Sequence, residues 1–163
     1  MDRNPAVTLR PAEPRDRETL RAALIDLHNY ENALSDTHLP GAGTVDAYLA
    51  WMLEHARARQ GAIVVAQAGE EFSGFLSCWV EAEDNPQQAP DSNRYGFIAD
   101  VYVAPAMRGR GVAQMLLDAA QDHLKAQAVS RLRISALANN ASALAAYRKG
   151  GFAPYEVALE KRV

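Results

Sequence analysis

The sequence is poor in the features that mark secreted, metal-binding or membrane proteins. Cys78 is its one cysteine in 163 residues, which excludes an internal disulfide, a cysteine-based zinc site and a Cys-x-x-Cys redox motif. No apolar run approaches the roughly 18 residues that a membrane-spanning helix needs. Residues 1–5 contain no apolar signal core. We therefore expect a cytoplasmic protein that has no metal site.

Net charge is also small, at −3, but it is unevenly divided. Residues 1–98 hold 15 acidic and 8 basic side chains, whereas residues 99–163 hold 5 acidic and 9 basic ones. The acidic total argues against nucleic acid or an anionic membrane as a partner, because both attract a basic face. The basic second part suggests that it holds an anionic partner.

Hydrophobic periodicity predicts one α+β domain over residues 1–163, with a central mixed, mostly antiparallel sheet flanked by about four helices. Strands are expected at residues 7–10, 62–68, 72–80, 95–103, 132–136 and 153–159. Helices are expected from Pro14 past Leu27, from Thr44 to Gly61, over residues 109–128, and from Asn139 or Asn140 to Lys149. The polar stretch 29–43 is expected to be a loop or a broken helix.

Residues 100–113 form the segment whose sequence pattern indicates a binding site. A predicted strand runs into the turn Arg108-Gly109-Arg110-Gly111, and this turn opens a helix. A helix N-terminus has unpaired N–H groups that attract anions, and glycine lets a phosphate approach the backbone closely. The pattern predicts a phosphate or pyrophosphate site, although no Gly-Lys-Ser/Thr follows as in a P-loop. The alternative is an exposed basic turn that only caps the helix.

A second motif lies downstream and makes the pair specific. Arg108-x-x-Gly111-x-Ala113 is followed by Asn140-x-x-Ala143-x-x-x-Tyr147-x-x-x-Gly151-Phe152. Together these motifs resemble the GCN5-related N-acetyltransferase (GNAT) family over residues 95–152. The opening Thr8-Leu9-Arg10-Pro11-Ala12, with Asp16, extends the resemblance loosely over the chain. The resemblance implies a GNAT-like domain that transfers acetyl from acetyl-CoA to an amine.

The resemblance also assigns roles to particular residues. It implies that backbone groups of Val101, Tyr102 and Val103 pair with the pantetheine arm of the cosubstrate as if with an added strand. Asn140 would contact the cofactor arm further along, and Tyr147 would lie near the sulfur. The residues implied to cradle the pyrophosphate are Arg108, Gly109, Arg110, Gly111, Val112 and Ala113.

The acetyl transfer needs an acid, because the departing group is a thiolate. A thiol has a pKa of about 8.5 and a tyrosine of about 10, so proton transfer from Tyr147 is uphill by roughly 1.5 units before any environmental shift. A positioned general acid typically contributes 10²–10⁴-fold to the rate. The alternative is that Tyr147 is a core aromatic on a short helix.

The reaction also needs the amine to lose a proton. Asp100 is the nearest acidic candidate, in an otherwise apolar strand where a buried carboxylate is costly unless it is paired. The family often has its acid one residue earlier, where this chain has Ala99, and a one-residue shift turns a side chain to the other face. Asp100 is therefore either the base or a structural acid. Glu31, Glu81 and His28 are the alternative bases.

The acceptor itself has no motif in this sequence. Residues 28–43 and 81–94 are expected to shape its pocket, and the acidic first part favours a cationic amine. We predict transfer to a primary amine of a small molecule or peptide by direct attack in a ternary complex, since no nucleophile stands out. The alternative is a non-catalytic acyl-CoA sensor or regulatory module of the same fold. The resemblance also allows a homodimer.

Overall fold

The computed structural model describes residues 5–163, so the expectation for residues 1–4 lies outside the described part. Short 3₁₀ turns stand at Pro14–Asp16, Pro90–Ser92 and Pro105–Met107. The strands are β1 (Val7–Pro11), β2 (Ala62–Ala68), β3 (Glu71–Ala82), β4 (Arg94–Val103) and β5 (Leu132–Ile134). The helices are α1 (Arg17–Leu34), α2 (Gly41–Ala58), α3 (Val112–Ala126) and α4 (Ala141–Lys149).

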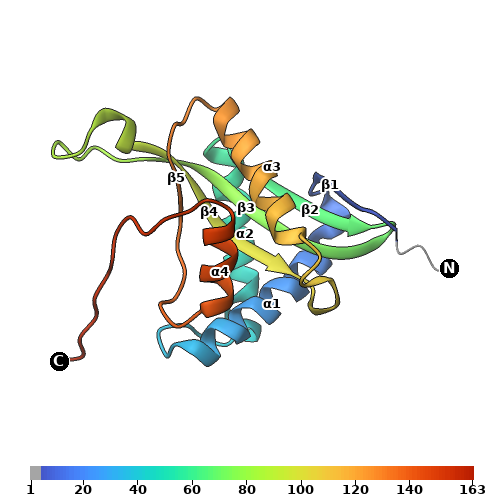
Figure 1. The fold of residues 1–163 in the computed structure, drawn as a ribbon. Coiled ribbons are helices and arrows are strands. Elements are labelled where there is room, and N and C mark those ends of the chain that lie inside the picture. The colour runs from blue at the N-terminus through green and yellow to red at the C-terminus, as the bar shows by residue number, and fades with distance from the viewer. Residues whose placement is uncertain (1–4) are drawn as a thin grey trace.

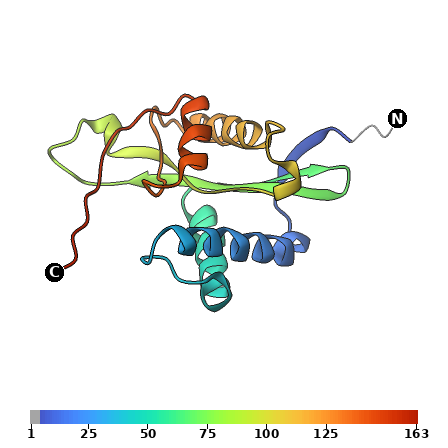
Figure 2. The ribbon, with the colours of Figure 1, turned by 60° about the horizontal axis from the view of Figure 1, so that its bottom comes forward.

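The strands form one sheet in the order β1-β2-β3-β4-β5. The pairs from β1 to β4 are antiparallel, and β4 pairs with β5 in parallel. Helices α3 and α4 cover one face of the sheet and α1 and α2 cover the other (Figures 1 and 2). The expected α+β fold with a mixed, mostly antiparallel sheet is confirmed. No helix within residues 5–163 is long and apolar enough to cross a membrane.

Two apolar clusters hold the layers together, one on each face of the sheet. Neighbouring residues of β3 point to opposite faces, so Cys78 enters the cluster beneath α3 while Trp79 enters the cluster beneath α1 and α2. Both side chains are almost completely buried, at 0% and 1% exposure. Buried residues recur at helical spacing on the helices, and these are Val112, Leu116, Ala120 and Leu124 on α3, and Val45, Leu49, Met52 and Ala56 on α2.

The helices around residues 29–43 differ from the sequence prediction. Helix α1 continues to Leu34 through the stretch expected to be a loop, and α2 begins at Gly41 rather than after Thr44. The reason is a contact between the helices: the Asn29 side chain accepts a hydrogen bond of 2.9 Å from the Gly41 backbone N–H. A polar side chain within α1 therefore satisfies one of the free N–H groups of α2.

The strand predicted at residues 153–159 is wrong. Residues 153–163 have no regular secondary structure, and all of them are exposed. A strand needs a neighbour for its hydrogen bonds, and the segment runs away from the sheet after α4 (Figures 1 and 2). The alternating pattern is present without a partner strand in this chain.

Strand β4 has two irregularities that shape the site. Ser77 lies opposite Asp100 and Cys78 lies opposite Ile98, so Ala99 is an extra residue that forms a β-bulge. On the other side, β5 pairs only with Gly96, Phe97 and Ile98. Among the described strands, none pairs with residues 99–103 on that side.

The tight fit of β3 against β4 gives a first prediction. A Cβ atom on Gly74 would lie 2.4 Å from the backbone oxygen of Tyr102, so a Gly74→Ala substitution must displace the backbone. Overpacking of this kind costs about 1–3 kcal/mol, and we expect that loss in the free energy of unfolding measured by urea denaturation. Gly43→Ala is the matched control, because its Cβ meets nothing within 4 Å. Equal stability of both variants would contradict the steric argument.

Candidate active site

The candidate active site lies where β4 separates from β5. Residues 99–103 of β4 have a free edge there, so backbone groups of Val101 and Val103 can pair with an extended ligand, although the Val103 carbonyl also accepts a hydrogen bond of 3.2 Å from Arg108. The Tyr102 carbonyl faces Gly74 of β3 instead, so the pairing role predicted for the Tyr102 backbone does not fit this geometry. The Tyr102 side chain points into the cluster beneath α1 and α2, and its hydroxyl donates to Asp26 at 2.9 Å. Of this segment, only backbone groups of Val101 and Val103 are therefore suited to the role that the resemblance implies.

Asp100 is the buried charge of this region. Its side chain is enclosed, with the residue 5% exposed, and it accepts hydrogen bonds from the Ser77 hydroxyl at 2.5 Å and the Tyr48 hydroxyl at 2.9 Å. Burial raises the pKa of the carboxyl, and the two hydrogen bonds oppose that shift. Since both oxygens are occupied, Asp100 can exchange a proton with a ligand only through a partner such as Tyr48.

The bulge at Ala99 explains how Asp100 reaches this position. Without it, the strand alternation would place Ala99 and Asp100 on opposite faces. Ala99 packs against the cluster beneath α1 and α2, and the contact with Tyr48 of α2 places Asp100 on the same face. The bulge therefore places residues 99 and 100 on one face of the sheet.

Tyr147 lies on α4, on the opposite side of the sheet, and packs against the cluster beneath α3. Burial, helped by the negative charges of Glu31 and Asp100, raises its pKa to about 12. Tyr147 of α4, Glu31 of α1 and Asp100 of β4 are close enough for their charges to interact. They meet beyond the end of the β4–β5 pairing, where no strand lies between the two faces of the sheet. Tyr147 keeps its proton at neutral pH and is available as a donor.

Glu31 and His28 lie on the last turns of α1, beside Asp100 and its partner Tyr48. Glu31 is half-buried, and burial raises the pKa of its carboxyl, with His38 opposing and Asp100 adding to the rise. The His28 ring packs edge-on against Tyr48 at 4.6 Å, and burial lowers the pKa of His28. The end of α1 thus places two titratable groups beside Asp100 and Tyr48.

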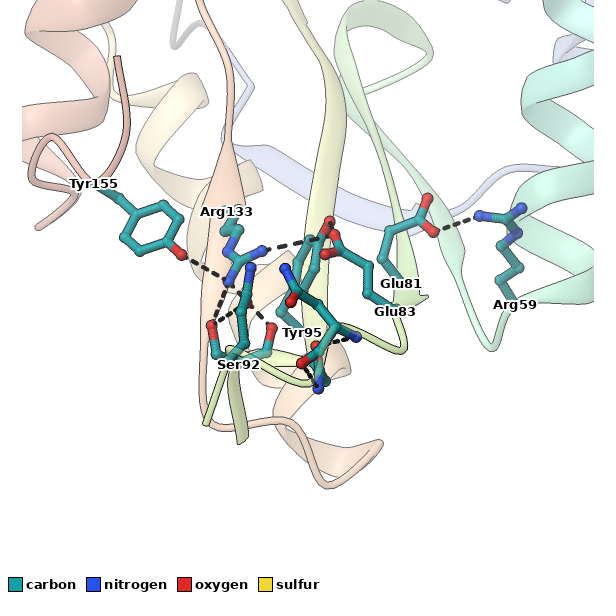
Figure 3. A network of polar contacts seen from close by, with 10 residues as sticks. Arg59, Glu81, Glu83, Ser92, Tyr95, Arg133 and Tyr155 are labelled. Atoms are coloured by element: carbon teal, nitrogen blue, oxygen red, sulfur yellow. Dashed lines mark hydrogen bonds and ion pairs between the residues drawn. The ribbon is translucent and has the colours of Figure 1, made fainter. Parts of the chain in front are cut away.

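Glu81, the remaining alternative base, is engaged elsewhere. It accepts a hydrogen bond from the Trp79 indole at 2.7 Å and forms an ion pair with Arg59 at 2.5 Å (Figure 3). These contacts belong to the outer part of β3, so the geometry does not favour Glu81 as a base. Of the two tryptophans, Trp79 is a core residue, whereas Trp51 is 42% exposed.

The glycine turn before α3 has the geometry of an anion site. Gly109 and Gly111 adopt φ values of +73° and +81°, a left-handed conformation that suits glycine. A Cβ atom at either position would meet nothing within 4 Å, so the space above both glycines is open. Arg108 and Arg110 are exposed beside it, and no acidic side chain stands in the first turn of α3. The N–H groups at the start of α3, including those of Val112 and Ala113, lie at the positive end of the helix dipole. The two arginines add positive charge beside them.

Asn140 caps α4, as one of the two predicted caps. Its Oδ1 accepts a hydrogen bond of 3.1 Å from the Ala143 N–H and lies 3.5 Å from the Tyr30 hydroxyl. Asn139 donates to the Leu34 carbonyl at 2.9 Å, which ties the end of α1 to the start of α4. These bonds fix the helix that carries Tyr147, and they leave the Asn140 Nδ2 group for a ligand.

Sequence reasoning missed Tyr48 and Ser77. The signal available was the cost of burying Asp100, which requires hydrogen-bond donors. Those donors come from 52 and 23 residues away, so one sequence cannot identify them.

A wide groove of about 860 Å³ lies elsewhere, along β1 and β2 near α2. Its lining includes Pro11, Leu20, Leu53, Ile63 and His123, and it contains none of the site residues above.

Comparisons with known proteins show the family of this chain. The sequence pattern of the Acetyltransferase (GNAT) family matches residues 27–152. A mycothiol acetyltransferase of Beutenbergia cavernae is 31% identical over 151 residues, covering 78% of this chain and 50% of that protein. This chain thus spans about half the length of that curated relative.

Solved structures resemble the whole fold. An aminoglycoside N-acetyltransferase in complex with CoA superposes with a TM-score of 0.75 at 21% identity, covering 100% of this chain and 98% of that one. A GCN5-related N-acetyltransferase from Ralstonia eutropha JMP134 superposes with a TM-score of 0.77 at 20% identity, covering 97% and 99%. From the match over residues 27–152 and this fold, the chain belongs to the GNAT family of acetyltransferases.

Proposed function

We propose that the protein transfers an acetyl group from acetyl-CoA to a primary amine of a small molecule or peptide. One observation carries the proposal: where β4 separates from β5, a free strand edge meets Tyr147 on one side of the sheet and the Asp100–Tyr48 pair on the other. A thioester lying along that edge would have a proton donor and a proton acceptor on opposite sides. Structural neighbours with CoA bound support the choice of donor.

The residues present fit acetyl-CoA. Its pantetheine amides would pair with the backbone of Val101 and Val103, extending the sheet. Its pyrophosphate would lie at the turn of Gly109 and Gly111, where open space, unpaired N–H groups and arginines coincide. Asn140 would contact the arm at the start of α4.

The proton transfers can then be written for this chain's own residues. The ammonium group first releases one proton to water, and the neutral amine nitrogen then attacks the thioester carbonyl carbon. The nitrogen's second proton passes to the Tyr48 oxygen while Tyr48 gives its own proton to Asp100. As the C–S bond breaks, Tyr147 donates its proton to the leaving thiolate. Direct transfer is favoured because Cys78 is 0% exposed and burial raises its pKa to about 11, so it is no nucleophile.

The acceptor is proposed to be a small amine, and a cationic one. Glu31 and Asp100 place two carboxyl groups at the site, and they attract an ammonium group before it is deprotonated. The relative named as a mycothiol acetyltransferase and the neighbour named as an aminoglycoside acetyltransferase agree with a small-molecule acceptor.

A thiol-release screen tests the function. The protein is incubated with acetyl-CoA and separately with polyamines, amino acids, aminoglycosides and peptides that have free N-termini, and free CoA is measured. We expect amine-dependent release with at least one class. Calorimetric binding of acetyl-CoA without release from any class would instead support the sensor or regulatory module.

Binding at the glycine turn can be tested separately. Gly111→Val forces a branched side chain into a left-handed conformation and fills the open space above the turn. We expect acetyl-CoA to bind at least tenfold more weakly by calorimetry, a loss of about 1.4 kcal/mol. Gly69→Val is the control for backbone strain, because Gly69 also has a positive φ, of +63°, but lies in the β2–β3 turn. Native affinity in Gly111→Val would overturn the pyrophosphate assignment.

A further inference from the structure

Helices α1 and α2 leave large apolar side chains in water near the candidate active site. Within residues 5–152, the large apolar side chains that remain exposed are Tyr30, Leu39 and Trp51, at 45%, 66% and 42%. All three come from α1, α2 or the connection between them, which is also the part of the chain that carries Tyr48. Scattered apolar residues are ordinary on a protein surface, but several from one region offer apolar surface to a ligand.

An aromatic row extends from the site across the face of the sheet that α1 and α2 cover. It consists of His28, Tyr48, Trp51, Trp79 and Phe97. The ring centroids are 4.6 Å apart for His28 and Tyr48, and 5.3 Å apart for Tyr48 and Trp51. Trp79 continues the row, at 5.3 Å from Trp51 and 6.0 Å from Phe97. The row begins at the site because the Tyr48 hydroxyl donates to Asp100 at 2.9 Å.

Trp51 is the member of the row that presents its ring to solvent. Trp79 is 1% exposed and lies beneath it, so the Trp51 ring rests edge-on against a buried neighbour. The His55 ring packs against Trp51 from the same helix, with centroids 4.1 Å apart. These contacts hold the Trp51 ring in place before any ligand binds, which lowers the cost of ordering it on binding. Trp51 therefore offers a fixed aromatic surface next to Tyr48.

The carboxyl groups near the row differ in whether they are already paired. Asp100 accepts from Ser77 and Tyr48, and Glu81 forms an ion pair with Arg59. Glu31 is half-buried, and among residues 5–163 no side chain forms a hydrogen bond or an ion pair with its carboxyl. A partly buried carboxylate is stabilised by a cationic partner. The site thus has one carboxylate ready for one ammonium group.

The hydrogen-bonding groups of the row are largely engaged within the protein. The Tyr48 hydroxyl donates to Asp100, and the Trp79 indole N–H donates to Glu81 at 2.7 Å. The surface left around Trp51 is mainly ring carbon. A ligand with many hydroxyl groups would lose hydrogen bonds to water there without replacing them, whereas an aromatic ring gains by packing against Trp51.

We propose that the acceptor is a primary amine with a single ammonium group that a short chain joins to an aromatic ring. The inference rests on the proposed acetyl transfer and specifies its substrate class. The ring packs on Trp51, and the ammonium group lies between Glu31 and Tyr48. Since the ring centroids of Tyr48 and Trp51 are 5.3 Å apart, a linker of two or three single bonds, each about 1.5 Å long, covers the distance. This class differs from the aminoglycosides that the structural neighbour is named for.

Kinetics of CoA release with matched amines test the substrate class. 2-Phenylethylamine and 2-aminoethanol both have the amine on a two-carbon chain and differ in the group at its other end, while spermidine adds further ammonium groups. We expect kcat/KM for 2-phenylethylamine to exceed that for the other two by about tenfold or more. An equal or higher value for 2-aminoethanol or spermidine would overturn the aromatic acceptor and leave acetyl transfer standing. No release with any amine would overturn both.

Trp51→Ala tests whether the aromatic row holds the ring of the acceptor. We expect kcat/KM for 2-phenylethylamine to fall about tenfold, through a higher KM, while kcat/KM for 2-aminoethanol and the affinity for acetyl-CoA stay nearly unchanged. Trp51→Phe keeps an aromatic ring and should recover most of the loss. Arg57→Ala is the matched control, because Arg57 is an exposed residue of α2 that pairs with Glu54, outside the row. An equal loss with both amines in Trp51→Ala would show a purely structural role for Trp51 and overturn the proposal.

Discussion

Tyr147→Phe is expected to lower kcat for CoA release by 10²–10⁴-fold and to leave acetyl-CoA affinity nearly unchanged. The substitution removes only the hydroxyl, so the packing of the ring against the cluster beneath α3 is kept. The range is the usual contribution of one positioned general acid. Because burial and nearby carboxyl groups raise the pKa of Tyr147 to about 12, the donor stays protonated at every ordinary assay pH. The fall in kcat caused by Tyr147→Phe should therefore be equally large at pH 7 and pH 9.

Tyr30→Phe is the matched control for this loss. The Tyr30 hydroxyl also faces the start of α4, 3.5 Å from Asn140, but the residue is 45% exposed and is not one of the proposed proton donors. We expect less than a threefold change in kcat. Unchanged turnover in Tyr147→Phe would contradict the acid role. A basic limb centred near pH 9 in the native pH profile that disappears in Tyr147→Phe would contradict the raised pKa.

The raised pKa also limits what Tyr147 contributes. The gap to a thiol, about 1.5 units from ordinary values, grows to about 3.5 units when Tyr147 has a pKa of about 12. Free transfer to a solvated thiolate is then unfavourable. In the proposed mechanism, the donor would therefore act through a hydrogen bond that strengthens as negative charge develops on the sulfur. Position therefore matters more here than acidity, and the Asn139 and Asn140 bonds supply it by fixing α4.

The sequence predicted best the elements whose structure depends on residues that are close together in the chain. The stripe on α3 and the Asn140 cap of α4 follow from helical spacing and from one side chain next to its own helix. The errors fall where the cause lies elsewhere in the chain. Asn29 and Asn32 look like loop residues, but within α1 they bond to Gly41 and His38 of the following segment. Polar composition alone could not show those partners.

The same distinction holds for the candidate site. The glycine turn is visible in the sequence because its spacing is local, and in the structure Gly109 and Gly111 both adopt a left-handed conformation. The orientation of Asp100 was ambiguous, because it depends on the bulge at Ala99, a property of the β3–β4 register. Tyr48, the group that links Asp100 to a ligand, lies 52 residues away on α2 and had no sequence signal.

The second large effect that we expect is from Asp100→Asn, which should keep or increase the stability of the fold while lowering the activity. Burial raises the pKa of the Asp100 carboxyl above its unfolded value, so the folded state binds more protons than the unfolded state in the pH range between the two values. The free energy of unfolding contributed by this group therefore falls as pH rises through that range and stays low above it. Asparagine carries no charge, its Oδ1 can accept from one hydroxyl, and its Nδ2 can donate to the oxygen of the other, so stability at neutral pH should be kept or increased.

Activity should change in the opposite direction. Without a carboxylate to accept the Tyr48 proton, kcat/KM for the amine should fall by at least 100-fold, and Tyr48→Phe should show a similar loss. The measurements are urea unfolding at pH 5 and pH 8 and the pH profile of kcat/KM. Glu31→Gln is the discriminating variant, because Glu31 is also half-buried at the site, with its pKa raised. If Glu31→Gln abolishes the acidic limb of that profile while Asp100→Asn keeps it, Glu31 is the base and Asp100 only orders Tyr48 and Ser77.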